Sequence, residues 1–418
     1  MKIILIDVLG LPYNYNTLET RGLGGSESSV IRISRELVKL GFEVTVINDH
    51  ISTGSSAEPD GVHYIPIKSM HHYPEEEFQC DIMISSRSVK PFRQPLPLGF
   101  EQLAICQKAH HRVLWMHDTF VDGENDLEPM VMSGAISEIF TLSDWHTVYV
   151  TNCTHGNRRN FEVLKNRVFQ TRNGVEQYQD FVDIKNKDKK LWVFNASYTK
   201  GMEPTVKEIW PRIKDGGQRL IVIGGYYRFP NGEADQQETD WQRLVRENKD
   251  KSIDFTGVIT QREISRILTQ ASYFLAPGQF PETFGISALE ATAHNVPVIA
   301  SRFGALEETC VPGATYFVDY TLKNNPLFQV DEHQQLHRFV EMCKFARDEE
   351  YIWQQKAYGG NIVKDIIGWD GIALQWKQHF YRLSDKTLEQ DEYQKVKWLN
   401  YRVHKVFGRR VSNFEDFL

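Results

Sequence analysis

Short apolar runs alternate with amphipathic stretches through most of the chain. Lys2–Val8 predicts a buried strand, and Ser26–Leu40 predicts a helix because its apolar side chains recur at helical spacing. Further strands in the first half are predicted at Phe42–Asn48, Asp81–Ser86, Arg112–His117 and Glu138–Leu142. Strands that alternate with helices form parallel sheets covered on both faces.

The pattern restarts in the second half, after a polar stretch at Phe181–Lys190 that is typical of a linker. Strands are predicted at Leu191–Ala196, Arg219–Gly224, Ile253–Val258, Tyr273–Ala276 and Val296–Ser301, and helices at Pro204–Lys214, Gln261–Gln270 and Gly285–His294. We therefore predict an α/β fold with two doubly wound, Rossmann-like domains that face a cleft. The expected parts are residues 1–182, residues 183–370, and C-terminal helices at 371–418 that pack back on the first domain. Ligands of such sheets bind beyond the carboxyl ends of the strands.

Composition restricts the class of function. The 418 residues are 41% hydrophobic and 25% charged, which is ordinary for a folded protein. Their 48 Lys and Arg against 55 Asp and Glu give a formal net charge of −7, which argues against a general nucleic-acid binder. Five widely spaced cysteines without a C-x-x-C pair indicate reduced thiols, so we expect a cytoplasmic protein. No apolar stretch reaches the roughly 18 residues that a membrane-spanning helix needs.

The most informative segment is Phe280–Glu290, Phe-Pro-Glu-Thr-Phe-Gly-Ile-Ser-Ala-Leu-Glu. Gly285 and Ile286 fall where a helix should begin, and the free backbone N–H groups there suit a diphosphate. Glu282 precedes the helix and Glu290 lies inside it, so the two carboxylates can accept hydrogen bonds from a sugar and from a ribose of one ligand. The spacing alone equally allows a helix start stabilised by Glu282, with Glu290 in solvent.

The residues around this segment follow one order. Phe-Thr-Gly-Val-Ile starts at Phe255, Val-Pro-Val-Ile-Ala-Ser starts at Val296, and Glu-Glu-Thr starts at Glu307. The chain resembles the retaining glycosyltransferases of family 4, which have the GT-B fold, over roughly residues 1–380. The resemblance implies transfer of a hexose from a nucleotide diphosphate sugar to an acceptor hydroxyl, with retention of anomeric configuration, in glycan or glycoconjugate assembly.

The resemblance also implies roles for the residues that bind the donor. Glu282 would contact the sugar hydroxyls and Glu290 the ribose. The other expected donor contacts are Gly24 and Gly25 near the diphosphate, Gly257 and Val258 near the base, and the backbone N–H groups of Phe284, Gly285 and Ile286. The glycine-rich loop has Glu27 where a dinucleotide-binding fingerprint needs its third glycine, which argues against an oxidoreductase.

Two further residues are expected to take part in catalysis beside Glu282. His117 ends a predicted strand and matches the family's active-site histidine, with Asp118 placed to orient its ring, although a lone histidine at a strand end is usually structural. Lys200 matches the basic residue that neutralises the departing diphosphate. The family usually has an arginine five residues earlier, where this chain has Asn195, and Arg228 is our candidate replacement.

The sequence predicts no metal and no cofactor, because the D-x-D triplet of metal-dependent glycosyltransferases is missing. The expected partners are a UDP- or GDP-sugar donor and a carbohydrate, lipid-linked or protein acceptor. Lys395–Arg410 is basic and amphipathic, so it is either a helix that rests on an anionic membrane or a final helix packed on the protein. The alternative functions are a non-catalytic nucleotide-sugar binding protein and a sugar-nucleotide epimerase of the same shape.

Overall fold

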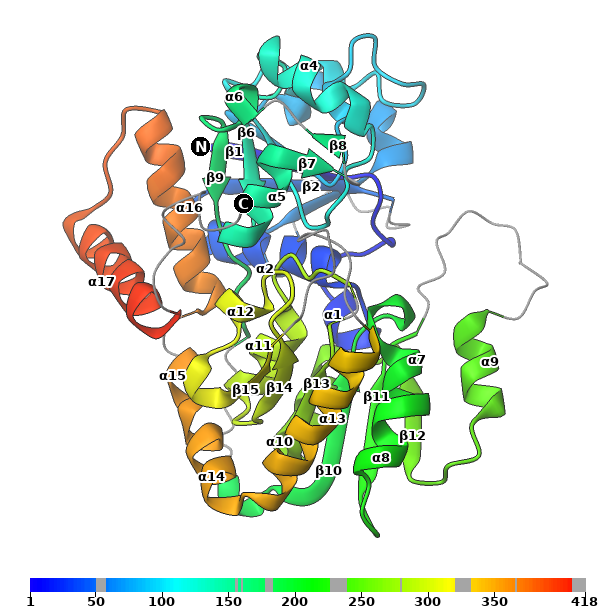
Figure 1. The fold of residues 1–418 in the computed structure, drawn as a ribbon. Helices are drawn as coiled ribbons and strands as arrows, with labels where there is room; N and C mark the ends of the chain where they lie inside the picture. Colours follow the sequence, from blue (N-terminus) through cyan, green and yellow to red (C-terminus); the bar gives the residue numbers. More distant parts are fainter. Residues whose placement is uncertain are drawn as a thin grey trace.

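The computed structural model contains two parallel β-sheets, one above the other in Figure 1, each flanked by helices. It describes residues 1–49, 58–154, 157–158, 161–176, 183–225, 239–278, 280–319, 332–364 and 367–407. The prediction of two doubly wound α/β domains is confirmed.

The first sheet has seven parallel strands in the order β3-β2-β1-β4-β5-β6-β9. The strand order reverses between β1 and β4, so the loops after these two strands diverge and leave a crevice. The strands are β1 (Lys2–Asp7), β2 (Glu43–Asn48), β3 (His63–Pro66), β4 (Ile82–Ser86), β5 (His111–Trp115), β6 (Glu138–Thr141) and β9 (Val168–Gln170).

The second sheet has six parallel strands in the order β12-β11-β10-β13-β14-β15, and its order reverses between β10 and β13. Its strands are β10 (Asp188–Asn195), β11 (Arg219–Ile223), β12 (Ile253–Gly257), β13 (Ala271–Ala276), β14 (Val298–Ser301) and β15 (Thr315–Val318). A separate antiparallel pair joins β7 (Cys153–Thr154) to β8 (Asn157–Arg158).

The longer helices cover the sheets and the boundary between them. They are α2 (Gly25–Lys39), α5 (Asp144–Asn152), α9 (Asp240–Glu247), α10 (Gln261–Gln270), α11 (Ile286–Ala293), α13 (Glu332–Asp348), α14 (Glu350–Gly359), α16 (Trp369–Leu383) and α17 (Gln390–Phe407). The short ones are α1 (Thr17–Thr20), α3 (Leu103–Cys106), α4 (Leu127–Met132), α6 (Phe161–Leu164), α7 (Met202–Pro204), α8 (Trp210–Ile213), α12 (Leu306–Thr309) and α15 (Asn361–Lys364).

Local chemistry explains where two of these helices begin and end. Helix α10 starts as predicted because Thr260 and Glu263 form a reciprocal capping box. The single helix predicted at Pro204–Lys214 is wrong in detail, since a π-helical turn at Thr205–Ile209 separates α7 from α8. Pro211 follows that turn and has no backbone N–H to donate, so the regular hydrogen-bond ladder cannot continue through it.

The C-terminal helix α16 belongs to the core of the first domain although it follows the second in the chain. Trp376 packs edge-on against Trp115 of β5 with ring centroids 4.9 Å apart, and its Nε1 donates to Oγ1 of Thr171 at 2.6 Å. Helix α17 then packs on α16 beside it (Figure 1), with Val396 and Leu399 buried. Its outer face exposes Trp398. Among the described residues, no helix is both long and apolar enough to cross a bilayer.

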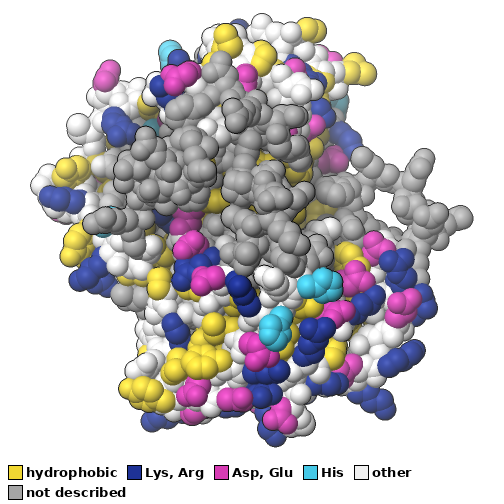
Figure 2. Space-filling view, in the orientation of Figure 1, with side chains coloured by type: hydrophobic (Ala, Val, Ile, Leu, Met, Phe, Trp, Pro, Cys, Tyr) yellow, Lys and Arg dark blue, Asp and Glu magenta, His cyan; other side chains and the backbone are white. Residues whose placement is uncertain are grey.

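The face of the second domain seen in Figure 2 carries charges of both signs. Figure 2 shows Lys and Arg side chains interspersed with Asp and Glu over the second domain, on the face turned to the viewer. On this face the charges do not form the continuous basic stripe that is typical of nucleic-acid binding.

Candidate active site

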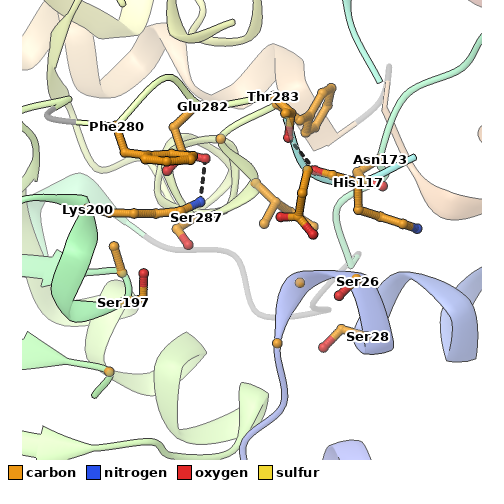
Figure 3. A pocket seen from close by; sticks show the side chains of 18 of the residues that line it. Ser26, Ser28, His117, Asn173, Ser197, Lys200, Phe280, Glu282, Thr283 and Ser287 are labelled. Atoms are coloured by element: carbon orange, nitrogen blue, oxygen red, sulfur yellow. Dashed lines mark hydrogen bonds and ion pairs between the residues drawn. The ribbon is translucent and has the colours of Figure 1, made fainter. Parts of the chain in front are cut away.

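A cleft of about 1050 Å³ lies between the two domains. Its walls are the loops that follow the strands next to each order reversal, together with the N-terminal ends of α2 and α11. Both sheets therefore direct the carboxyl ends of their strands at one cavity, where doubly wound folds bind ligands. Figure 3 shows side chains from both domains directed into it.

Lys200 and Glu282 form an ion pair on the second-domain wall of this cleft (Figure 3). Lys200 Nζ lies 2.8 Å from Glu282 Oε2, and a third of the Lys200 side chain remains exposed. Burial lowers the pKa of Lys200, but the charge of Glu282 and its hydrogen bond outweigh that effect, so the pKa ends above its usual value. Lys200 is therefore a fixed positive charge in the cleft.

The N-terminus of α11 opens into the cleft next to this pair. Gly285 precedes the helix in the left-handed conformation, with φ of +80°. A Cβ atom there would lie 2.7 Å from Cδ2 of Leu306, so glycine is needed both for its backbone angle and for space. No side chain caps this helix start, which leaves its N–H groups available to an anion.

Glu290 lines the deep end of the cleft, where it faces the first domain. Burial raises its pKa to about 7, against the opposing effect of Arg32 on α2, whose guanidinium lies 4.0 Å away. Arg32 also pairs with Glu176 at 2.9 Å. Glu290 is thus a buried carboxyl group. The alternative that the spacing allowed, with Glu290 in solvent, is wrong for this residue.

His117 stands on the opposite wall, at the end of β5. Its side chain is only 6% exposed, and Nε2 has no hydrogen-bond partner among the described residues. Burial, the charge of Arg87 and the nearby His146 all lower its pKa well below the usual value, so the ring is neutral. The backbone oxygen of His117 accepts a 2.6 Å hydrogen bond from Thr283 Oγ1 of the second domain (Figure 3).

His146 holds the loop that carries His117. Its Nδ1 accepts from the backbone N–H of Leu142 at 3.2 Å, which assigns the ring proton to Nε2. That Nε2 then donates to the carbonyl oxygen of Asp118 at 3.1 Å. Ser143 and His146 do not line the cleft; they act behind its wall, on its backbone.

Arg87 is a cleft residue that the sequence did not single out. It adopts a left-handed conformation with φ of +63°, which is uncommon outside glycine. Its guanidinium contacts Asp7 at 3.0 Å and Glu27 at 3.2 Å, and these charges raise its pKa against the effect of burial. Its place directly after the predicted strand Asp81–Ser86 was the available signal, because side chains at that end of a strand face the ligand.

The glycine-rich loop before α2 touches the second domain. A Cβ on Gly22 would lie 2.3 Å from Cγ1 of Val258, so only glycine allows the two loops to meet there. Gly24 is the N-cap of α2, and a Cβ on Gly25 would lie 3.5 Å from Cγ2 of Ile286. Both α2 and α11 therefore begin at the same part of the cleft.

A second set of bonds joins the domains beside the cleft. Glu308 of α12 accepts from the backbone N–H groups of Asp144 and Trp145 at 2.8 and 2.6 Å, and so caps the start of α5 across the domain boundary. Ser143 Oγ donates to the carbonyl oxygen of Thr283 at 2.8 Å. Burial raises the pKa of Glu308 to about 7 in spite of the backbone hydrogen bonds.

The structure brings most of the predicted site residues together. The cleft is lined by His117, Asp118, Lys200, Glu282, Phe284, Gly285, Ile286, Glu290, Gly24, Gly25 and Val258. Asn195 also lines it, in the place where the family usually has arginine. Gly257 is not among the lining residues, and its carbonyl instead accepts from Gly224 N at 2.9 Å. Arg228 lies outside the described residues.

No group of three or more His, Cys, Asp or Glu side chains is placed to hold a metal ion within the described ranges. Metal independence and the lack of a cofactor stay predictions. What the cleft does offer is one fixed lysine charge, an uncapped helix start and several carboxyl groups.

Comparison with known proteins agrees with this arrangement. Residues 189–329 match the family model "Glycosyl transferases group 1". The GDP-mannose-dependent alpha-(1-6)-phosphatidylinositol dimannoside mannosyltransferase of Mycobacterium tuberculosis is 34% identical over 122 residues, which is 28% of this chain and 30% of that protein. The D-inositol 3-phosphate glycosyltransferase of Corynebacterium efficiens is 30% identical over 110 residues, 26% of this chain and 25% of that protein. The chain thus matches less than a third of the length of these curated relatives.

Solved structures resemble the chain over nearly its whole length. Sucrose-phosphate synthase from Thermosynechococcus elongatus superimposes with a TM-score of 0.62 at 18% identity, over 92% of this chain and 99% of that one. Anabaena Alr3699/HepE in complex with UDP and glucose gives a TM-score of 0.60 at 14% identity, over 91% and 99% of the two chains. At these identities the likeness establishes the fold.

Proposed function

Because the chain carries a glycosyltransferase group 1 domain and has the GT-B fold, we propose that it transfers a hexose from a nucleotide diphosphate sugar to an acceptor hydroxyl. The observation that supports this most is the Lys200–Glu282 pair beside the uncapped start of α11. A cation and free N–H groups suit a departing diphosphate, and a carboxylate suits sugar hydroxyls. The relatives named for GDP-mannose and the structure solved with UDP support a UDP- or GDP-sugar donor.

In the proposed mechanism the donor lies on the second domain and the acceptor on the first. The acceptor oxygen forms a bond to the anomeric carbon on the face from which the diphosphate leaves, and the bond from that carbon to the phosphate oxygen breaks. The acceptor proton passes to the departing phosphate oxygen, so configuration is retained. Lys200 and the N–H groups of α11 stabilise the negative charge that develops, Glu282 orients the sugar, and neutral His117 sits near the anomeric carbon.

Lys200→Ala and Glu282→Gln test this site. Each should lower kcat by about 100-fold or more, in the range seen when one group that stabilises a transition-state charge is removed. Lys207→Ala is the matched control, since Lys207 pairs with Glu203 on the surface, outside the cleft, and should turn over normally. The measurement is steady-state product formation from UDP- and GDP-hexoses chosen by thermal shift. Near-normal turnover in both site variants would contradict the proposal.

Two outcomes would favour the other functions. Isomerisation of the donor without any acceptor would indicate an epimerase. Donor binding without consumption would indicate a binding protein, and Asn195 in place of the family's arginine is the sequence feature that favours this alternative. NMR of the product tests retention, and activity in excess chelator tests metal independence. Contact of α17 with an anionic membrane stays a prediction, as do lipid-linked and protein acceptors.

A further inference from the structure

The part of the cleft that the proposed donor leaves vacant has its own chemical character. We call it the acceptor arm: the cleft-lining loop Phe120–Asp126 after β5, together with Arg93. The arm continues directly from His117 and Asp118 and belongs to the same cavity as Lys200 and Glu282. A volume of about 1050 Å³ is at the upper end of single-ligand pockets, which leaves room for a second substrate beside a donor.

The basic side chains at the arm are all held by carboxylates. Arg93 Nε donates to Asp126 Oδ2 at 2.7 Å, and Lys90 Nζ lies 2.9 Å from Asp122 Oδ2. Arg87, next along the wall, is held by Asp7 and Glu27. An anionic ligand at Arg93 would therefore compete with Asp126, whereas Arg87 keeps a buried Nε that has no partner among the described residues.

The balance of charge on this wall is negative. From residue 87 to residue 126 the cleft is lined by two arginines and four acidic residues, which are Asp118, Asp122, Glu124 and Asp126. Lys90, outside the lining, compensates Asp122, and burial raises the pKa of Asp118, so the excess of negative charge comes from Glu124 and from the partial charge of Asp118. A phosphate group on an acceptor would meet this excess of like charge at close range, within a Debye length of about 8 Å at physiological salt. An uncharged acceptor would meet no such repulsion.

The arm also offers the two kinds of contact that a sugar needs. Phe120 is 45% exposed at the cleft and presents an apolar surface to the C–H face of a sugar ring. The neighbouring carboxylates are acceptors for hydroxyl groups. At the inner end of the arm, His117 Nε2 is buried and has no partner among the described residues, so a ligand hydroxyl there would complete its hydrogen bonding.

From this arrangement we infer that the acceptor is an uncharged sugar or polyol bound along Phe120–Asp126, and that phosphorylated acceptors are rejected. The inference rests on the proposed glycosyl transfer and specifies its second substrate. Arg93 and Asp126 act as a specificity device: the paired carboxylate removes the one arginine of the arm that would otherwise attract a phosphate.

The test uses acceptor pairs that differ only by a phosphate, namely glucose and glucose 6-phosphate, mannose and mannose 6-phosphate, and inositol and inositol 3-phosphate. For the pair that is used best, kcat/KM for the uncharged member should exceed that of its phosphate ester by at least about tenfold, and the ratio should fall as salt rises. Equal or preferred use of the phosphate ester would overturn the inference.

Three variants make the test specific. Asp126→Asn releases Arg93 and should raise kcat/KM for the phosphate ester several-fold while changing the uncharged acceptor little. Glu128→Gln, two residues further on α4 and outside the cleft lining, is the matched control for loss of a charge. Phe120→Ala should raise KM for the uncharged acceptor without changing donor binding. No effect of Phe120→Ala and Asp126→Asn on acceptor use would contradict the placement.

Donor hydrolysis in water separates this inference from the proposed function. If the donor is neither bound nor consumed, the proposed function fails. If the donor is hydrolysed and no uncharged sugar diverts it into product or inhibits its hydrolysis, the transfer site stands and the inference about its acceptor fails.

Discussion

At the scale of single residues, sequence and structure agree on the groups whose chemistry is local. Glu282 and Lys200 could be singled out because the segments that carry them resemble motifs of a known glycosyltransferase family. Their meeting could not be predicted, since they are 82 positions apart in the chain. The contact between Thr283 and the carbonyl of His117 spans 166 positions and depends on a backbone group, which no side-chain motif reveals.

Glu290 leads to a prediction about pH and stability. Its pKa in the folded protein is about 7 because it is buried, whereas an exposed glutamate ionises near 4.5. Between these values the unfolded chain has released a proton that the folded chain retains, so the free energy of unfolding decreases as pH rises through this window. Glu290→Gln cannot titrate and should therefore gain stability relative to the wild type, by up to about 3 kcal/mol above pH 8.

Urea unfolding between pH 5 and pH 8.5 measures this difference. The advantage of Glu290→Gln should be small at pH 5 and should grow with pH, and Arg32 should keep its partner Glu176 in the variant. A difference that is constant with pH would show that Glu290 titrates normally. A buried carboxyl group that costs stability at neutral pH is typical of a functional position.

At the scale of elements, amphipathic and buried patterns located most of the sheet strands, and helices α2, α10 and α11, within one or two residues. The strands that were not predicted, β3, β7, β8, β9 and β15, are two to four residues long, so they give periodicity little to act on. The π-helical turn before Trp210 arises from Pro211, a backbone effect that hydrophobic periodicity does not encode. The C-terminal helices were expected to pack back on the first domain, although the apolar face of α16 does not itself encode which sheet it covers.

The start of α11 carries a prediction at this scale. Gly285→Ala forces a left-handed conformation on a residue with a Cβ atom and presses that atom against Leu306. The backbone cost alone is about 1–2 kcal/mol. Because the helix start presents the N–H groups proposed for the diphosphate, the variant should also bind nucleoside diphosphates more weakly.

Urea unfolding and titration with UDP and GDP would measure the two effects of Gly285→Ala. Gly216→Ala is the matched control, since Gly216 has no positive φ and a Cβ there meets no atom within 4 Å. The control should change neither quantity. If Gly285→Ala lost stability but bound UDP and GDP as tightly as the wild type, the start of α11 would not be part of the donor site.

At the scale of the whole molecule, contacts between the two domains bring the ligand-binding edges of the two sheets together in one cleft. Glu308, Ser143 and Thr283 tie the loop after β6 to the loops around Glu282, and Thr283 in turn contacts the backbone of His117. These bonds set the position of His117 relative to the second-domain wall of the cleft, where the donor is proposed to bind. The relative placement of the domains therefore depends on a few buried polar contacts beside the cleft.

Removing the carboxylate of Glu308 should loosen this placement. In Glu308→Ala, two N–H groups at the start of α5 lose their acceptor, and an ordinary hydrogen bond contributes about 0.5–1.5 kcal/mol. We expect faster hydrogen exchange at Asp144 and Trp145, a larger radius of gyration in solution scattering, and kcat reduced by at least about tenfold. Glu307→Ala is the matched control on the same helix, because Glu307 is exposed and pairs with Arg302 within its own domain. If Glu308→Ala turned over like Glu307→Ala although its α5 amides exchanged faster, the domain contact would serve stability alone, and the position of His117 would have to be fixed by Thr283.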